Sequence, residues 1–122
     1  MSKKILVAED DKFIAHAYKS ALADAKYETM VAGDGRETLK LAQKFKPDLI
    51  LLDLVMPIKN GFETLKDLRK DQATKDIPVI VLSNLGQESD IEQCEKYGIA
   101  DYLVKSNVSM KDVIKCIKKA LK

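Results

Sequence analysis

Three carboxylates stand where a short apolar run ends. Glu9 and Asp10 follow the run over residues 5–8, and Asp53 follows the run over residues 49–52. If these runs are neighbouring strands, the acids cluster, and two carboxylates ~5 Å apart repel by roughly 3 kcal/mol at an effective dielectric of about 20. Such a cluster needs a cation. Because its donors are all oxygens, with no His or Cys among them, the chemistry favours Mg2+, an ion usually shared with a phosphate.

Asp53 is also a candidate nucleophile. A buried strand would deliver it to the edge of a sheet, where a carboxylate can attack an electrophile. Ser83 and Lys105 follow apolar runs as well, and they supply a hydroxyl and a cation. These are the two donors that a phosphoryl group needs. Asp11, taken alone, is better explained as a cap on the helix that follows it.

Five elements of one kind must position these residues. The apolar runs lie at residues 5–8, 29–32, 49–52, 79–82 and 102–104, and polar residues scarcely interrupt them. This pattern predicts strands buried on both faces, and therefore a parallel sheet. The segments between them have helical spacing, as in Ile14, Ala17, Tyr18 and Leu22. The sequence thus predicts an α/β fold, a doubly wound (βα)5 sandwich whose ligands bind beyond the carboxyl ends of the strands.

Helix boundaries agree with this fold. Asp34 and Ser109 each precede an acid by three residues, which is typical of a helix start. Gly98 is expected to end a helix over residues 89–97. The second strand follows the polar residues 26–28, so it is expected at an edge of the sheet.

Composition limits the function classes. The chain has 122 residues, enough for one domain over residues 1–122 that buries roughly two thirds of its surface. The net charge of +2 implies neither nucleic acid nor membrane as a partner. No apolar run approaches the ~20 residues of a membrane span, and the start is not expected to be a signal peptide. Cys94 and Cys116 fit no metal or disulfide spacing, so free thiols and a cytoplasmic location are expected.

Motifs at the ends of the predicted strands resemble a known family. They are ILVAED at residues 5–10, DLVMP at residues 53–57 with Gly61, VLS at residues 81–83 and YLVK at residues 102–105. Together they resemble the response-regulator receiver domain (CheY-like) along the whole chain. The resemblance implies a flavodoxin-like five-stranded parallel sheet of order 2-1-3-4-5. It also implies a stand-alone receiver in a two-component system.

The resemblance further implies a phosphoacceptor site. Asp53 would accept a phosphoryl group from a histidine kinase or histidine phosphotransfer protein and form an acyl phosphate. Glu9 and Asp10 would hold Mg2+ together with Asp53 and the backbone carbonyl of Val55. Lys105 would pair with Asp53 and then with a phosphoryl oxygen.

A switch is implied as well. Ser83 would move toward the phosphate and Tyr102 would swing inward, which would alter the surface of helix 4, strand 5 and helix 5 for a downstream effector protein. The chain is not expected to be an enzyme beyond self-phosphorylation and slow self-dephosphorylation at Asp53. A monomer is expected, with dimers on phosphorylation as an open option.

Departures from the family pattern give two further predictions. Ser106 stands where the family usually has a cis proline, and a cis Lys105–Ser106 bond would cost roughly 3–4 kcal/mol, so a trans bond is predicted. Asn84 replaces a small residue and could narrow access to Asp53. The resemblance also implies that Val55 and Leu85 lie nearest to an attacking water, and neither side chain can hydrogen-bond it, which predicts slow loss of the phosphoryl group.

Three alternatives stay open. The chain could be a receiver fragment of a larger multidomain regulator, or a degenerate receiver that acts only through protein contacts. It could also be a phosphatase of the haloacid-dehalogenase type, which likewise uses an Asp nucleophile and Mg2+. That family needs a second Asp two residues after the first, where this chain has Val55.

Overall fold

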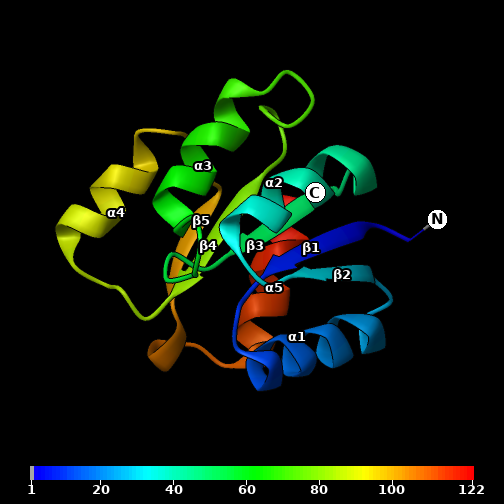
Figure 1. Ribbon diagram of the computed structural model, residues 1–122. Helices are drawn as coiled ribbons and strands as arrows, with labels where there is room; N and C mark the ends of the chain where they lie inside the picture. The colour runs from blue at the N-terminus through cyan, green and yellow to red at the C-terminus, as the bar shows by residue number, and fades with distance from the viewer. Residues whose placement is uncertain (1) are drawn as a thin grey trace.

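Five strands alternate with five helices in the computed structural model, which describes residues 2–122. Their bounds are β1 Lys4–Ala8, α1 Lys12–Asp24, β2 Glu28–Ala32, α2 Gly35–Phe45, β3 Leu49–Leu52, α3 Gly61–Lys70, β4 Val79–Ser83, α4 Glu88–Glu95, β5 Asp101–Val104 and α5 Met110–Ala120. Each strand is thus followed by a helix, as the apolar runs predict (Figure 1).

The strands form one parallel sheet of order β2-β1-β3-β4-β5. Helices α1 and α5 cover one face of the sheet, and α2, α3 and α4 cover the other (Figure 1). This is the predicted doubly wound, flavodoxin-like architecture, and the predicted strand order is confirmed. Because every strand points the same way, all five carboxyl ends lie at one edge of the sheet.

Burial separates the central strands from the outer ones. Every residue of β3 and β4 is buried, and so are the last four residues of β1. The prediction of burial on both faces was wrong for β2, whose exposed and covered residues alternate, and for β5, where no residue is fully buried. Both are edge strands, and the helices pack over the centre of the sheet. The expected edge position of β2 is confirmed.

Two apolar cores, one on each face, hold the helices to the sheet. Leu65 and Leu68 of α3 belong to one core, and Leu22 of α1 belongs to the other. On α1 the buried residues are Ala15 and Leu22, and Ile14 and Tyr18 on the same side are partly buried, whereas Ala17 is exposed. The sequence spacing had grouped Ala17 with the buried residues, which was wrong.

The predicted helix caps are present. Asp34 Oδ1 accepts a hydrogen bond of 2.7 Å from the Glu37 amide, and Ser109 and Asp112 cap each other's amides at 3.2 and 2.9 Å. Helix α4 ends at Glu95, two residues before the predicted end at Tyr97, and Gly98, with φ of 72°, follows the intervening turn. None of these helices, in the part of the chain described, is long and apolar enough to cross a membrane.

The link from β5 to α5 follows the trans prediction. No cis peptide bond occurs within residues 2–122, so the Lys105–Ser106 bond is trans, as predicted from the absence of proline. The residues Lys105–Asn107 form one turn of 3-10 helix, and Ser109 then caps α5. This turn keeps Lys105 at the carboxyl edge of the sheet.

Candidate functional site

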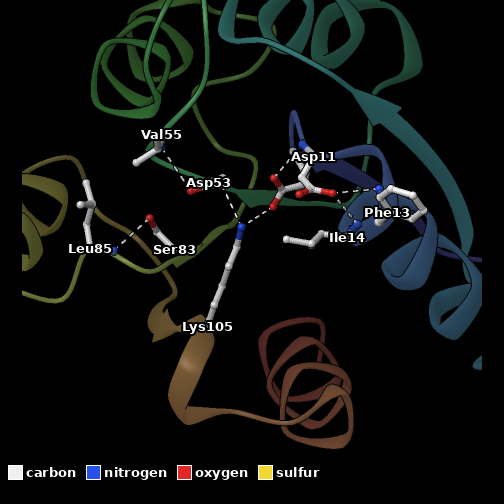
Figure 2. Close-up of polar contacts among 9 residues, drawn as sticks. Asp11, Phe13, Ile14, Asp53, Val55, Ser83, Leu85 and Lys105 are labelled. Atoms are coloured by element: carbon white, nitrogen blue, oxygen red, sulfur yellow. Dashed lines mark hydrogen bonds and ion pairs between the residues drawn. The ribbon is translucent and has the colours of Figure 1, made fainter.

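Side chains from four strand ends meet at the carboxyl edge of the sheet (Figure 2). The neighbouring strands β1 and β3 bring Glu9 beside Asp53, since the Asp53 amide donates to the Ala8 carbonyl at 3.1 Å. Ser83 ends β4, and Lys105 follows β5 and extends toward Asp53. The structure therefore brings the predicted site residues to one place.

The acidic cluster predicted from the sequence is present. Glu9, Asp10 and Asp53 each offer a carboxylate oxygen, and these three atoms lie within 4.8 Å of one another. Glu9 is 3% exposed and Asp53 is 6% exposed, whereas Asp10 is open to solvent. A donor set of three carboxylates with one side facing water fits a hard ion such as Mg2+.

Lys105 joins the two buried acids. Its Nζ donates to the Glu9 carboxylate and to Asp53 Oδ2, the latter at 2.9 Å. Burial lowers the pKa of Lys105, but these hydrogen bonds outweigh burial, so the pKa is raised and the side chain remains a cation. Burial raises the pKa of Glu9 despite the opposing hydrogen bond from Lys105. The ammonium thus offsets part of the repulsion between the carboxylates.

Asp11 caps α1, which is the role that the sequence favoured for it. Its Oδ1 accepts from the amides of Phe13 and Ile14 at 2.9 and 3.1 Å (Figure 2). Its own amide donates to Glu9 Oε2 at 3.1 Å. The cap therefore holds one Glu9 oxygen, while Lys105 holds the other.

The turn after β3 fixes Asp53. Asp53 Oδ1 accepts from the Val55 amide at 3.2 Å, and the Gly61 amide donates to the Leu54 carbonyl at 2.9 Å. A Cβ on Gly61 would lie 2.3 Å from the Asp53 carbonyl oxygen, so only glycine lets α3 begin this close to the phosphoacceptor candidate. Asn60 caps the helix there, since its Oδ1 accepts from the Glu63 amide at 3.0 Å.

The two predicted switch residues share a partner that the sequence did not indicate. Ser83 is fully buried, and its Oγ accepts from the Leu85 amide at 3.3 Å. The half-buried Tyr102 donates its hydroxyl to the Leu85 carbonyl, and burial raises the pKa of Tyr102 to about 12. The backbone of Leu85 thus links the end of β4 to β5. Neighbouring Asn84 is exposed.

One further residue, Tyr18, borders the site, and the sequence did not predict this. Tyr18 lies with Glu9 and Asp53 around a gap that is too small to hold a water molecule. The helical spacing of apolar residues predicted that Tyr18 faces the sheet. That spacing does not show which strand end the side chain lies beside. His16, on the same helix, is exposed and takes no part in the site.

Comparisons with known proteins agree with this geometry. The sequence model of the response regulator receiver domain matches residues 5–118. The chain is 41% identical over 102 residues to the DNA-binding dual master transcriptional regulator RpaA of Synechocystis, a match that covers 84% of this chain and 42% of RpaA. The chain thus spans less than half of RpaA. It is 31% identical to the polar-differentiation response regulator DivK of Brucella ovis, and this match covers 99% of the chain and 98% of DivK.

Solved structures of this fold superpose closely on the chain. The chemotaxis protein CheY4 of Vibrio cholerae has a TM-score of 0.92 and 30% sequence identity, and the match covers 99% of this chain and 100% of CheY4. The likeness therefore includes every element from β1 to α5 as well as the carboxyl edge that carries the acids.

Proposed function

Since this chain belongs to the response regulator receiver domain family, we propose that it is a phosphorylation-controlled signalling module whose phosphoacceptor is Asp53. One observation carries the proposal. Lys105 bridges the buried Asp53 and Glu9, and Asp10 borders the same space. A nucleophile, a cation and a metal-type donor set therefore stand within one small site.

The proposed reaction is the transfer of a phosphoryl group from a phosphohistidine to Asp53. A carboxylate oxygen attacks phosphorus, the P–N bond breaks, and the imidazole leaves while an acyl phosphate forms. Lys105 and Ser83 are the donors available to the phosphoryl oxygens. Lys105 is already hydrogen-bonded to Asp53, so this donor is in position before the reaction starts, which is the arrangement that best stabilises developing charge.

Glu9, Asp10, Asp53 and the Val55 carbonyl would hold Mg2+, because hard oxygen donors are what this ion prefers. Bound there, the ion supplies positive charge that draws the anionic phosphoryl group toward the carboxylates. The chain's own part is to hold the carboxylates of Glu9 and Asp53 in place, through Lys105 and through the amides of Asp11 and Val55.

The proposed output is a change at the surface formed by α4, β5 and α5. This proposal is supported by two hydrogen bonds to the Leu85 backbone. The Leu85 amide donates to Ser83 Oγ, and the Leu85 carbonyl accepts from the Tyr102 hydroxyl. If Ser83 turns toward a phosphoryl oxygen, both bonds must readjust, which biases a two-state loop. The proposed partners are a histidine kinase or phosphotransfer protein and a downstream effector protein.

Intact-mass measurement tests the acceptor. The chain is incubated with Mg2+ and acetyl phosphate, and we expect a gain of one phosphoryl group that excess chelator prevents. Asp53→Asn should abolish the gain. Asp112→Asn is the matched control, since Asp112 caps α5 outside the carboxylate cluster, and it should be phosphorylated like the parent. Equal phosphorylation of Asp53→Asn and the parent would refute Asp53 as the acceptor.

The proposed coupling has its own test. Lys105→Ala should fold and still accept phosphate, but it should lose the phosphorylation-dependent shifts of α4 and α5 amide signals, because the cation links the end of β5 to the phosphoryl oxygen. Full shifts in this variant would show that Lys105 does not couple the site to the surface.

A further inference from the structure

The first residue of α2 touches the turn that follows Asp53. A Cβ on Gly35 would lie 2.0 Å from the Lys59 carbonyl oxygen and 2.3 Å from Thr64 Oγ1. Atoms cannot approach this closely, so the contact requires that position 35 carry no side chain. Gly98 is the glycine with positive φ among the described residues, so Gly35 is needed for space and not for an unusual backbone conformation.

The neighbours of Gly35 cannot easily retreat. Thr64 is fully buried, and its Oγ1 donates to the Asn60 carbonyl at 2.8 Å. On α2 itself, Thr38 and Ala42 are fully buried. The helices α2 and α3 lie on the same face of the sheet and are in contact (Figure 1). A displaced Lys59 carbonyl would therefore move the turn and not the helices.

The turn of residues 54–60 is short and closed by hydrogen bonds, so a displacement of one residue should shift the backbone of the others. The Lys59 amide donates to the Pro57 carbonyl at 2.7 Å, and the bond from the Gly61 amide to the Leu54 carbonyl joins the two ends of the turn. Val55 lies inside this closed segment, with its amide on Asp53 Oδ1. Lys59 and Val55 therefore belong to one segment that is closed by backbone hydrogen bonds.

We propose that Gly35 is a positioning residue for the phosphoacceptor site: its bare Cα seats the turn of residues 54–60 against α2 and so places the backbone of Val55 beside Asp53. This inference rests on the proposed function for the roles of Asp53 and the Val55 carbonyl. Gly35 itself touches neither the carboxylates nor the incoming phosphate, and it acts through Lys59 and Thr64.

The chain offers a matched pair of substitutions. In Gly35→Ala the new methyl group meets the Lys59 carbonyl, whereas in Gly33→Ala, two residues before α2 begins, it meets nothing within 4 Å. Alanine is the better helix former, so helix propensity alone would leave Gly35→Ala at least as stable as the parent. If the methyl group instead displaces the turn, the backbone amide signals of Val55 and Lys59 should change in Gly35→Ala.

The first measurement needs neither metal nor phosphate. We expect the amide signals of Val55 and Lys59 in Gly35→Ala to shift, while those of Val113 on the opposite face of the sheet stay in place. Titration with Mg2+ alone should then show about tenfold weaker binding, the lower end of what loss of support behind metal ligands costs. Gly33→Ala should bind within about twofold of the parent.

A second variant keeps the test decisive if Gly35→Ala does not fold. Lys59→Ala leaves the carbonyl in place and removes only the ion pair between Lys59 and Asp67 on α3. If α2 seats the turn, this variant keeps the Val55 amide signal and binds Mg2+ within about twofold of the parent. A loss in Lys59→Ala as large as that expected for Gly35→Ala would overturn the proposal, as would parent-like signals and affinity in Gly35→Ala.

The outcome can be separated from failure of the proposed function. If the parent chain takes up no phosphoryl group, the role of Asp53 fails, while the amide shifts of Val55 and Lys59 still decide whether Gly35 seats the turn. If the parent is phosphorylated and Gly35→Ala behaves like Gly33→Ala in every measurement, the positioning role alone fails.

Discussion

The two loops on either side of the phosphoacceptor site are held in different ways. The turn after β3 is closed by the bond from Gly61 to Leu54, pressed against α2 at Gly35 and tied to α3 by the Lys59–Asp67 ion pair. The loop after β4 is held through the Leu85 backbone, which is bound by two side-chain hydroxyls.

The helices that follow these two loops differ in how many of their residues are buried. Helix α3 buries four residues, Gly61, Thr64, Leu65 and Leu68, whereas α4 buries only Cys94 among its eight. Regions with few buried apolar contacts open more easily. The nucleophile therefore stands on the fixed side of the site, and the proposed response belongs to the loosely held side. Precise chemistry needs the first arrangement, and a switch needs the second.

The largest expected difference is in stability. Leu65→Ala removes a fully buried side chain of α3 and should lower the free energy of unfolding by about 2–5 kcal/mol. Ile91→Ala truncates a partly exposed side chain of α4 and should cost about 1 kcal/mol. Urea denaturation measures both. Equal losses would mean that α4 is packed as firmly as α3, and the comparison would break.

A second prediction concerns the lifetime of the acyl phosphate. Val55, 57% exposed on the turn after β3, and Leu85, on the loop after β4, cannot orient a hydrolytic water. Val55→Asn should speed the decay of the phosphorylated chain by at least about tenfold, and Leu85→Glu should speed it less, because its loop holds the new group less firmly.

Decay is followed by intact mass after removal of the donor. If the parent decays as fast as both variants, another group controls the water, and the exposed Asn84 is then the first to test. If Leu85→Glu decays faster than Val55→Asn, the loop after β4 positions a side chain as well as the turn after β3 does.

Tyr102→Phe tests how the loop after β4 is held. It removes the hydroxyl that donates to the Leu85 carbonyl, a bond whose loss should cost about 1 kcal/mol. Amides of residues 85–87 should then exchange roughly fivefold faster with solvent. Amides of the turn after β3 serve as the internal control and should be unchanged. Uniform acceleration across both loops would argue against a local role for this bond.

The smallest effect is a pH dependence at the far end of α3. The amide of Ala73 and the side chain of Gln43 donate to Asp71, and they lower the pKa of its carboxyl. This stabilisation is present above the unfolded pKa of about 3.9 and is lost as pH falls through the lower folded pKa. The urea midpoint of the parent should therefore drop more steeply below about pH 4 than that of Asp71→Asn. If the urea midpoints of the parent and of Asp71→Asn fall in parallel with pH, the hydrogen bonds to Asp71 add no stability.

Much of the architecture is local in origin and was therefore predictable. Each strand contains an apolar run of three or four residues, Glu9 and Asp53 each follow a strand directly, and the caps at Asp34 and Ser109 span three residues. The same holds for the trans Lys105–Ser106 bond, which depends only on the absence of proline. The strand order came from the family resemblance, since apolar runs do not specify which strands are neighbours.

What the sequence could not determine are the contacts between segments distant in the chain. Lys105 reaches Glu9 across 96 residues, and Arg69 of α3 donates to the Tyr97 carbonyl after α4 at 2.8 Å, across 28 residues. Gly35 reads as an ordinary helix start until α3 is packed beside it. By itself the sequence determined which residues stand at strand ends, because strand and cap patterns depend on near neighbours. Only the tertiary structure decided which of them meet, since that depends on how the helices pack on the sheet.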